Sequence, residues 1–215
     1  FVCAILTFFQ VRDLKAGEAL NRPLFTWMNT GTYEFDQLQL KIPITLRADH
    51  LTALMLLVVT SVGLLVHIYS VGYMHGDGGY YRFFAYLPLF VFSMLMLVLA
   101  DNYLLLFVFW EAVGLCSYFL VGFWFHRETA NNAALKAFWV NRVGDVGFGL
   151  GTMLVWTTFG TFTFTEVFKQ VEERFSAGDI TKGTITAICL LLFCGSVGKS
   201  AQVPLHVWLP DAMEG

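Results

Sequence analysis

Charged residues are scarce in this chain, and their scarcity excludes most soluble proteins. Of its 215 residues only 13% are Asp, Glu, Lys or Arg, whereas 57% are hydrophobic and 22 are Phe. Soluble domains carry about 25% charged residues, so the composition indicates a membrane protein. The net charge is only −3, without a basic face, which argues against nucleic acid as a partner. The lipid bilayer is the expected environment.

Motifs for metal, phosphate and covalent chemistry are also missing from the sequence. It contains no Gly-rich phosphate loop, no Cys or His cluster and no nucleophile constellation. The four cysteines lie in apolar segments without a Cys-x-x-Cys pair, so we interpret them as packing residues: Cys3, Cys116, Cys189 and Cys194. A Gly-x-x-x-Gly step at Gly147 and Gly151 indicates close helix packing rather than a nucleotide site. We therefore predict no cofactor, metal or redox centre in this chain.

Five apolar stretches are long enough to cross a bilayer, which takes about 20 helical residues. They are 51–69, 83–100, 103–125, 133–159 and 185–209. The chain opens inside an apolar helix at 1–10 without an initiator Met, so we interpret it as an internal piece of a longer protein. The pattern predicts an all-α integral membrane protein, a polytopic bundle with about six helices.

Two segments between these spans have other periodicities. Residues 38–47 alternate apolar and non-apolar side chains, as a strand does, and Pro43 favours an edge position. Residues 163–177 have one apolar helical face, with a capping box at Thr163 and Glu166 and a stop at Gly178. The predicted organisation is therefore a helix end at 1–10, an extramembrane strand or hairpin in 11–47, four membrane helices in 48–159, an extramembrane amphipathic segment in 160–184 and a broken helix in 185–215. Loops 11–47 and 160–184 fall on one side, and the charge count does not decide which side that is.

Two ionisable side chains lie deep in their spans. Glu111 is nine residues into its span and Lys199 is fifteen into a span that starts on the same side. Their depths are then about 13 Å and 22 Å, a gap that flexible side chains and one water can largely bridge. A buried Lys costs roughly 2.5–3.5 kcal/mol, and Pro204 frees the carbonyl of Ser200 beside it. We interpret the pair as a proton relay; the alternative is a static ion pair that joins two helices.

Four further residues are candidate members of this site. Arg142 and Asp145 are spaced i, i+3 and share a helix face, so they either tune the relay or neutralise each other. Lys136 lies near a membrane end, where it can extend to the interface. His206 follows Lys199 by seven residues, two helical turns along one face, and can extend the relay or serve as a core histidine.

The motifs around these charges resemble a known family. They are residues 101–106 (DNYLLL), 110–118 (WEAVGLCSY), 141–145 (NRVGD) and 198–202 (GKSAQ) through 208–215 (WLPDAMEG). They are similar to the antiporter-like L/5 membrane subunits of respiratory complex I, the proton-pumping NADH:quinone oxidoreductase. The resemblance covers essentially residues 35–215. Ala112 stands where this family usually has Gly.

The resemblance implies an antiporter-like bundle of inverted repeats with a broken helix in each half. It implies that Glu111 and Lys199 drive proton movement, with Asp145 and Arg142 beside them, and that His206 matches a histidine of some members. Loops 11–47 and 160–184 would face the periplasm or the intermembrane space. The chain would belong to a hetero-oligomer with other membrane subunits, in a bacterial cytoplasmic or mitochondrial inner membrane. NADH, FMN, iron–sulfur clusters and quinone would be bound by partner subunits.

Three functions are compatible with these features. The first is a proton-translocating subunit that couples NADH oxidation and quinone reduction elsewhere in complex I to pumping. The second is a subunit of an Mrp-type multisubunit cation/proton antiporter, which has similar helices and no redox partner. The third is a membrane scaffold without transport, which gives no reason for a mid-membrane Lys199 close to Pro204. Segments 20–47 and 198–215 resemble complex I more closely than the antiporter, and on that resemblance we predict the first function.

Overall fold

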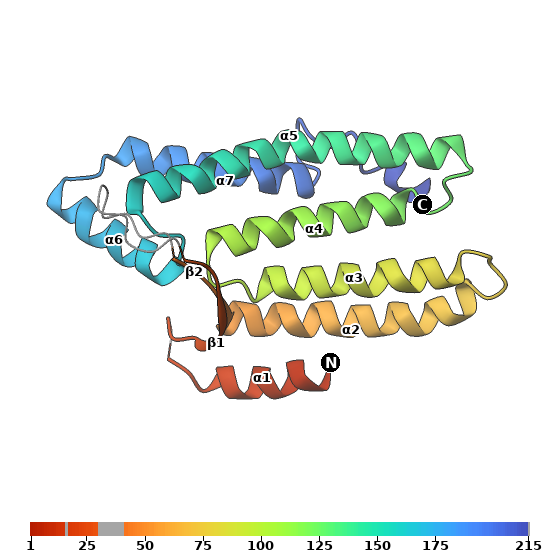
Figure 1. Ribbon diagram of the computed structural model, residues 1–215, viewed down its shortest axis with the longest axis horizontal. Helices are drawn as coiled ribbons and strands as arrows, with labels where there is room; N and C mark the ends of the chain where they lie inside the picture. Colours follow the sequence, from red (N-terminus) through yellow and green to blue (C-terminus); the bar gives the residue numbers. More distant parts are fainter. Residues whose placement is uncertain (16, 30–40, 215) are drawn as a thin grey trace.

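The computed structural model describes residues 1–15, 17–29 and 41–214 (Figure 1). Over this part of the chain it has seven α-helices, one two-stranded sheet and a short 3₁₀ helix, in agreement with the predicted helical membrane bundle. The elements are α1 (Val2–Arg12), β1 (Leu20–Asn29), β2 (Lys41–Ala48), α2 (His50–Tyr73), α3 (Tyr80–Val98), α4 (Tyr103–Val121), α5 (Glu128–Phe159), α6 (Phe164–Ala177), α7 (Lys182–Lys199) and η1 (Asp211–Glu214).

The long helices pack in sequence order. Each of α1 to α4 contacts the next, α4 contacts α5, and α7 returns along α5 (Figure 1). Four of them, α2, α3, α4 and α7, are long and apolar enough to cross a membrane by length and composition. The 32-residue α5 lies between α4 and α7 and carries the charges of the predicted 133–159 span, which lower its hydropathy.

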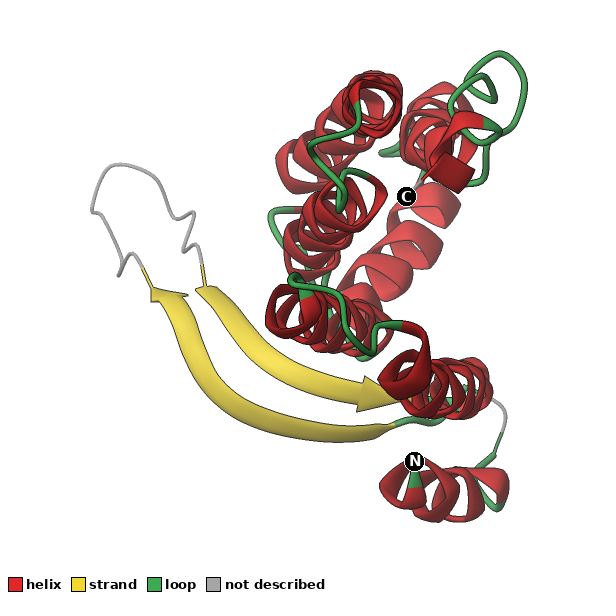
Figure 2. Cartoon of the chain, turned by 90° about the vertical axis from the view of Figure 1, so that its right-hand side faces the viewer, coloured by secondary structure: helices red, strands yellow, loops and turns green. Residues whose placement is uncertain are grey.

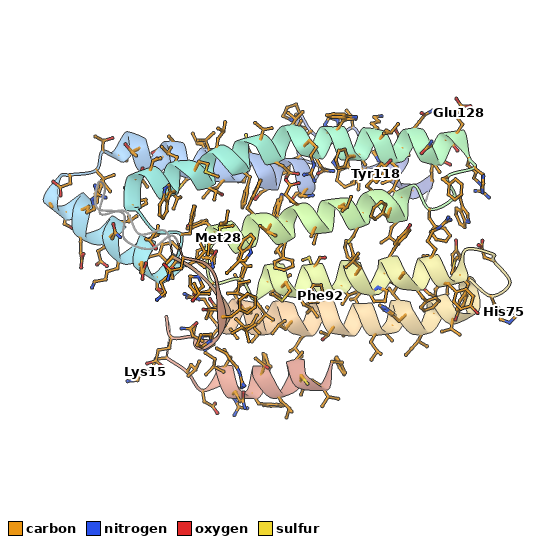
Figure 3. The ribbon with its side chains drawn as sticks, viewed as in Figure 1. Lys15, Met28, His75, Phe92, Tyr118 and Glu128 are labelled. Atoms are coloured by element: carbon orange, nitrogen blue, oxygen red, sulfur yellow. The ribbon has the colours of Figure 1, made fainter. Side chains whose placement is uncertain are left out.

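The two ends of the bundle have different contents. The strands and α6 lie at one end, and the α2–α3 and α4–α5 connections lie at the other (Figure 1). Figure 3 shows the same division, with Lys15 at the first end and His75 and Glu128 at the second. The described parts of 11–47 and 160–184 therefore share one end, as the apolar pattern predicts.

The sheet is an antiparallel hairpin that projects away from the helices (Figure 2). Strand β2 covers most of the strand predicted at 38–47, of which residues 38–40 lie outside the described residues. Its partner β1 is exposed along its whole length, so no side is buried to impose the alternation that makes a strand recognisable. Pro43 pairs with Thr26 across the hairpin, and in a two-stranded sheet that is an edge strand, as predicted.

The tight α3–α4 turn fixes where α4 begins. Asn102 is buried, and its Oδ1 accepts a hydrogen bond from the Leu105 N–H at 2.8 Å, which caps α4. Its Nδ2 donates to the Pro43 carbonyl of β2 at 3.0 Å. The Phe164 N–H at the start of α6 donates to the Asp101 carbonyl at 3.1 Å. One turn thus joins α4 to the hairpin and to α6, and sets the height of Glu111 in the bundle.

At the opposite end, Asp77 joins two loops. Its Oδ1 accepts from the Gly79 N–H at 2.6 Å, and its Oδ2 accepts from the Trp124 indole at 3.3 Å. The hydrogen bond from Gly79, with that from Trp124, lowers the pKa of the Asp77 carboxyl. This contact ties the α2–α3 loop to the residues that follow α4.

The capping box predicted for α6 is wrong, whereas the stop is confirmed. The Thr163 side chain makes no cap hydrogen bond. The Glu166 carboxylate instead accepts from the hydroxyl of Thr161, which lies outside the helix. Gly178 ends the helix in the left-handed region, at φ +81°.

The helix break predicted in 185–215 is present, but it lies earlier than Pro204. Helix α7 ends at Lys199, and the chain leaves it through Ala201 at φ +49°. The Trp208 indole folds back and donates to the Gly198 carbonyl at 3.0 Å, which satisfies one of the last carbonyls of α7. The break therefore directly follows Lys199 instead of lying at Pro204, because the chain turns back after the lysine.

The α5–α7 contact depends on glycine, as the Gly-x-x-x-Gly step predicts. A Cβ atom built at Gly147 would lie 2.6 Å from the Cβ of Cys194 on α7, and one at Gly151 would lie 3.0 Å from the Leu192 nitrogen. The separation at Gly147 is closer than packed atoms tolerate, and the one at Gly151 is tighter than most real contacts. The glycine face of α5 therefore allows a close approach to α7, which brings the charged residues of α5 up to that helix.

We expect Gly147→Ala to weaken this contact. Gly149 on the same helix is the matched control, because a Cβ there would lie 3.5 Å from the Phe107 ring, an ordinary contact. Gly149→Ala should be neutral or stabilising by up to about 1 kcal/mol through helix propensity. The melting temperature of the detergent-solubilised protein should fall only for Gly147→Ala. Equal temperatures for the two variants would contradict the packing described here.

Candidate functional site

Four of the predicted site residues meet where α4, α5 and the end of α7 converge. We call Glu111, Arg142, Asp145 and Lys199 the charge cluster. Glu111 lies at the middle of α4, Arg142 and Asp145 lie one turn apart on α5, and Lys199 is the last residue of α7. Three helices thus supply alternating charges to one place.

The ion pairs of the charge cluster form a chain. Arg142 Nη1 pairs with Glu111 Oε2, and Arg142 Nη2 lies 3.3 Å from Asp145 Oδ2. Lys199 Nζ lies 3.9 Å from the same Asp145 oxygen. Within the described residues no ion pair joins Glu111 directly to Lys199. The predicted gap between these two residues is thus filled by Arg142 and Asp145, because α5 packs between α4 and α7.

Burial makes this arrangement significant. The Asp145 side chain is 3% exposed, Lys199 18% and Arg142 22%. In the part of the chain that the structure describes, three of the four buried side-chain atoms without a hydrogen-bond partner lie here: Asn141 Oδ1, Arg142 Nε and Asp145 Oδ2. Buried polar atoms are normally satisfied, often by water. The charge cluster therefore has hydrogen-bonding capacity that the described protein groups leave unused.

An aromatic residue beside Glu111 contacts the other end of the charge cluster. The Trp110 indole N–H donates to Asp145 Oδ1 at 2.6 Å, and Lys199 Nζ lies 5.9 Å from the centre of the Trp110 ring. The indole is stacked on Phe148 of α5 with 5.1 Å between ring centroids. The candidate residues chosen from the sequence did not include Trp110. Its place in the 110–118 motif, next to the glutamate, was the available signal.

The candidate residues chosen from the sequence also did not include Gly114. A Cβ atom built there would lie 2.5 Å from both Arg142 Nη2 and Lys199 Nζ. The two cations therefore approach Asp145 through the space that this residue leaves empty. In sequence alone Gly114 is one small residue of an apolar span.

We expect Gly114→Ala to separate the two cations from Asp145 and, on the proton-transport function predicted from the sequence, to lower transport several-fold. Gly72→Ala is the control, since a Cβ at that position in α2 meets no atom within 4 Å. Both variants should assemble, and acidification of proteoliposomes should be impaired only for Gly114→Ala. Normal transport by Gly114→Ala would show that the space is not needed.

The other two predicted residues lie outside the charge cluster. Lys136 Nζ pairs with Asp211 Oδ2 at 2.7 Å and joins α5 to η1, with both side chains about 44% exposed. His206 is exposed in the segment after α7. The expectation that it shares a helical face with Lys199 is wrong, because the helix ends before it. Roles in proton transfer for these two residues stay predictions.

Metal ligands are not gathered anywhere in the described ranges. Among residues 1–15, 17–29 and 41–214 no group of three or more His, Cys, Asp or Glu side chains could hold a metal ion. The chemistry that the charge cluster can perform is gain, loss and transfer of protons between carboxylates, an amine and water.

Family comparisons match two consecutive parts of the chain. Residues 27–84 match the family described as "NADH-Ubiquinone oxidoreductase (complex I), chain 5 N-terminus". Residues 100–215 match the family described as "NADH:quinone oxidoreductase/Mrp antiporter, TM". All four residues of the charge cluster lie in the second region.

Individual proteins agree with these families. The chain is 48% identical to NAD(P)H-quinone oxidoreductase subunit 5, organellar chromatophore 1, of Paulinella chromatophora. The alignment covers the whole of this chain and 31% of that protein. It is 49% identical over 89% of its length to 28% of NADH-quinone oxidoreductase subunit L of Neisseria meningitidis. A chain in the Mrp complex of Dietzia sp. superimposes with a TM-score of 0.74 at 26% identity, over 99% of this chain and 21% of that one. The present chain spans about a third of the length of these curated relatives.

Proposed function

The chain belongs to the NADH:quinone oxidoreductase/Mrp antiporter family of transmembrane subunits, and we propose that it is a proton-translocating membrane subunit of a complex I-type enzyme. The relatives named as subunit 5 and subunit L support this proposal. The observation that carries it is the charge cluster, four alternating charges at the junction of three helices. Intramembrane charges of this kind mark ion pathways far more often than they serve stability.

Proton transfer follows from competition within the charge cluster. Arg142 is shared between Glu111 and Asp145, while Asp145 Oδ2 is shared between Arg142 and Lys199. When Glu111 takes up a proton it no longer attracts Arg142, which then interacts with Asp145 alone. Arg142 displaces Lys199, whose charge loses its counter-ion, and the amine gives its proton to an acceptor in the remaining part of the transport route. One proton enters at Glu111 and one leaves Lys199.

The energy source lies outside this chain. We place NADH oxidation and quinone reduction, with FMN and iron–sulfur clusters, in partner subunits, and assign this chain to the membrane part next to other antiporter-like subunits. A conformational change in a neighbour would alter the distance between α4 and α5, and so the strength of the Glu111–Arg142 pair. The present chain corresponds to about a third of its relatives, so it would form one part of the transport route.

The proposed orientation follows the two ends of the bundle. The hairpin of β1 and β2 and the amphipathic α6 form the extramembrane regions 11–47 and 160–184, on the periplasmic or intermembrane-space side. The membrane itself would be the bacterial cytoplasmic membrane or the mitochondrial inner membrane. Lys199 then lies on the side of the charge cluster away from the hairpin, at the point where α7 ends.

An Mrp-type cation/proton antiporter is the second candidate, favoured by the structural match to the Mrp complex at 26% identity. The two functions differ in the assembly that holds the chain. We expect mild-detergent extraction, native separation and an NADH-oxidation stain to show activity in the band that contains the chain. A smaller, unstained assembly with Na⁺-dependent proton exchange in vesicles would instead identify the antiporter.

A further inference from the structure

We propose that Trp110 is a positioning residue of the proton relay, and that its indole forces Arg142 and Lys199 to compete for a single oxygen of Asp145. This inference rests on the proposed function and adds a residue that the charges themselves do not reveal. Trp110 has no ionisable group, so it acts through Asp145 rather than by carrying a proton.

The two carboxylate oxygens of Asp145 have different partners. Asp145 Oδ1 accepts the Trp110 N–H at 2.6 Å, a short hydrogen bond. Asp145 Oδ2 lies 3.3 Å from Arg142 and 3.9 Å from Lys199, without a hydrogen bond to either. This hydrogen bond fixes the rotation of the carboxylate, so that Oδ2 is the oxygen that faces both cations.

Competition requires this restriction. A carboxylate has two oxygens and about four acceptor positions, so a freely rotating Asp145 could bind Arg142 with one oxygen and Lys199 with the other. Both cations would then be held at once, and uptake of a proton at Glu111 would leave Lys199 undisturbed. The indole N–H prevents this arrangement, because a rotation of the carboxylate would break its hydrogen bond.

Packing holds the Trp110 indole in one orientation. Trp110 and Phe148 are stacked with an interplanar angle of 3°, and Phe148 is 5% exposed. Phe148 packs on Gly195 of α7, where a Cβ atom would lie 2.8 Å from the Phe148 Cβ. Residues of α4, α5 and α7 therefore hold the ring in one position. Trp110 and Glu111 are adjacent on α4. One turn of this helix therefore supplies Glu111, which pairs with Arg142, and the indole that binds Asp145, the other partner of Arg142.

The ring face has a second effect. Lys199 Nζ lies 5.9 Å from the centre of the Trp110 ring, within the range of a cation–π interaction. A lysine displaced from Asp145 by Arg142 is thus kept beside the charge cluster, close enough to return to Oδ2 once Glu111 has released its proton. The relay can be reset without a large movement of α7.

The test is Trp110→Phe in the complete complex, reconstituted in proteoliposomes. Phenylalanine keeps a ring against Phe148 and removes the N–H donor. Assembly and uncoupled NADH oxidation should match the unaltered complex, while protons pumped per NADH should fall by the same fraction as in Asp145→Ala. The matched control is Trp124→Phe, which removes an indole–carboxylate hydrogen bond to Asp77 outside the charge cluster and should leave the ratio unchanged.

A double variant separates positioning from a structural effect. If Trp110 acts through Asp145, Trp110→Phe should lower the ratio no further in an Asp145→Ala background. An unchanged ratio in Trp110→Phe, or a full additional loss in the double variant, would overturn the inference. Phe148→Leu tests the claim again without altering the charge cluster or the indole. It should lower the ratio, and an unaltered ratio there would also overturn the inference.

The same measurements distinguish the two proposals. Full pumping in Asp145→Ala and in Glu111→Gln would refute the proposed relay itself. Reduced pumping in those two variants with normal pumping in Trp110→Phe would refute only the role of Trp110.

Discussion

Lys199→Ala is expected to abolish proton translocation through this subunit in a complex that still assembles and oxidises NADH. The amine at the end of α7 is the group of the charge cluster that gives up a proton in the relay, and alanine cannot replace it. Loss of the cation also leaves Asp145 with Arg142 as its single charged partner, so the competition that drives the relay ends. The measurement is protons pumped per NADH in proteoliposomes.

The control for this variant lies on the same helix. Lys182 is the first residue of α7 and is exposed, so Lys182→Ala removes one lysine charge from α7 without touching the charge cluster. It should pump normally. Uncoupler-sensitive pumping at the full ratio in Lys199→Ala would remove Lys199 from the relay.

Arg142→Ala is expected to reduce the amount of assembled complex by at least about tenfold. Arg142 pairs with both Glu111 and Asp145, and removal of one partner from a buried ion pair costs about 3–5 kcal/mol because a charge is left without compensation. The measurement is the quantity of the chain in the native complex band. Lys136→Ala on the same helix breaks an exposed pair with Asp211, worth about 0–1 kcal/mol, and should leave assembly unchanged.

A second substitution shows whether the charge itself is the cause. The loss of Arg142 in Arg142→Ala leaves the Glu111 carboxylate unpaired. Adding Glu111→Gln removes that charge, so the amount of assembled complex should partly recover. Arg142→Ala with normal assembly would mean that water or a neighbouring subunit solvates Glu111, and that Arg142 does not hold the three helices together.

The sequence predicts the bundle because a bilayer imposes strong and local requirements. Long apolar stretches can only be membrane helices, and the apolar face of 163–177 has a clear helical period, so α2 to α7 are recognisable from residue type and order. The exposed strand β1 carries no such period. The early end of α7 depends on Trp208 folding back onto Gly198, a contact between residues ten positions apart that no local pattern encodes.

Four of the six candidate residues meet in the charge cluster, and of the contacts among them the sequence predicted only the Arg142–Asp145 pair. Glu111, Arg142, Asp145 and Lys199 are recognisable because a charge inside an apolar span is conspicuous. Their order of contact depends on which helix lies between the others, and α5 separates α4 from α7. Trp110 and Gly114 contribute a hydrogen bond and an empty space. Both are properties of three-dimensional packing, and the sequence alone does not indicate them for uncharged residues.

The most direct test of the central claim is the number of protons pumped per NADH by Glu111→Gln complexes in sealed proteoliposomes. Glutamine keeps the size of the side chain and one acceptor oxygen for Arg142, and it removes the ability to take up and release a proton. Glu128→Gln at the exposed start of α5 is the control. The charge-cluster relay predicts a lowered ratio for Glu111→Gln with normal assembly and normal NADH oxidation. An unchanged, uncoupler-sensitive ratio would contradict it.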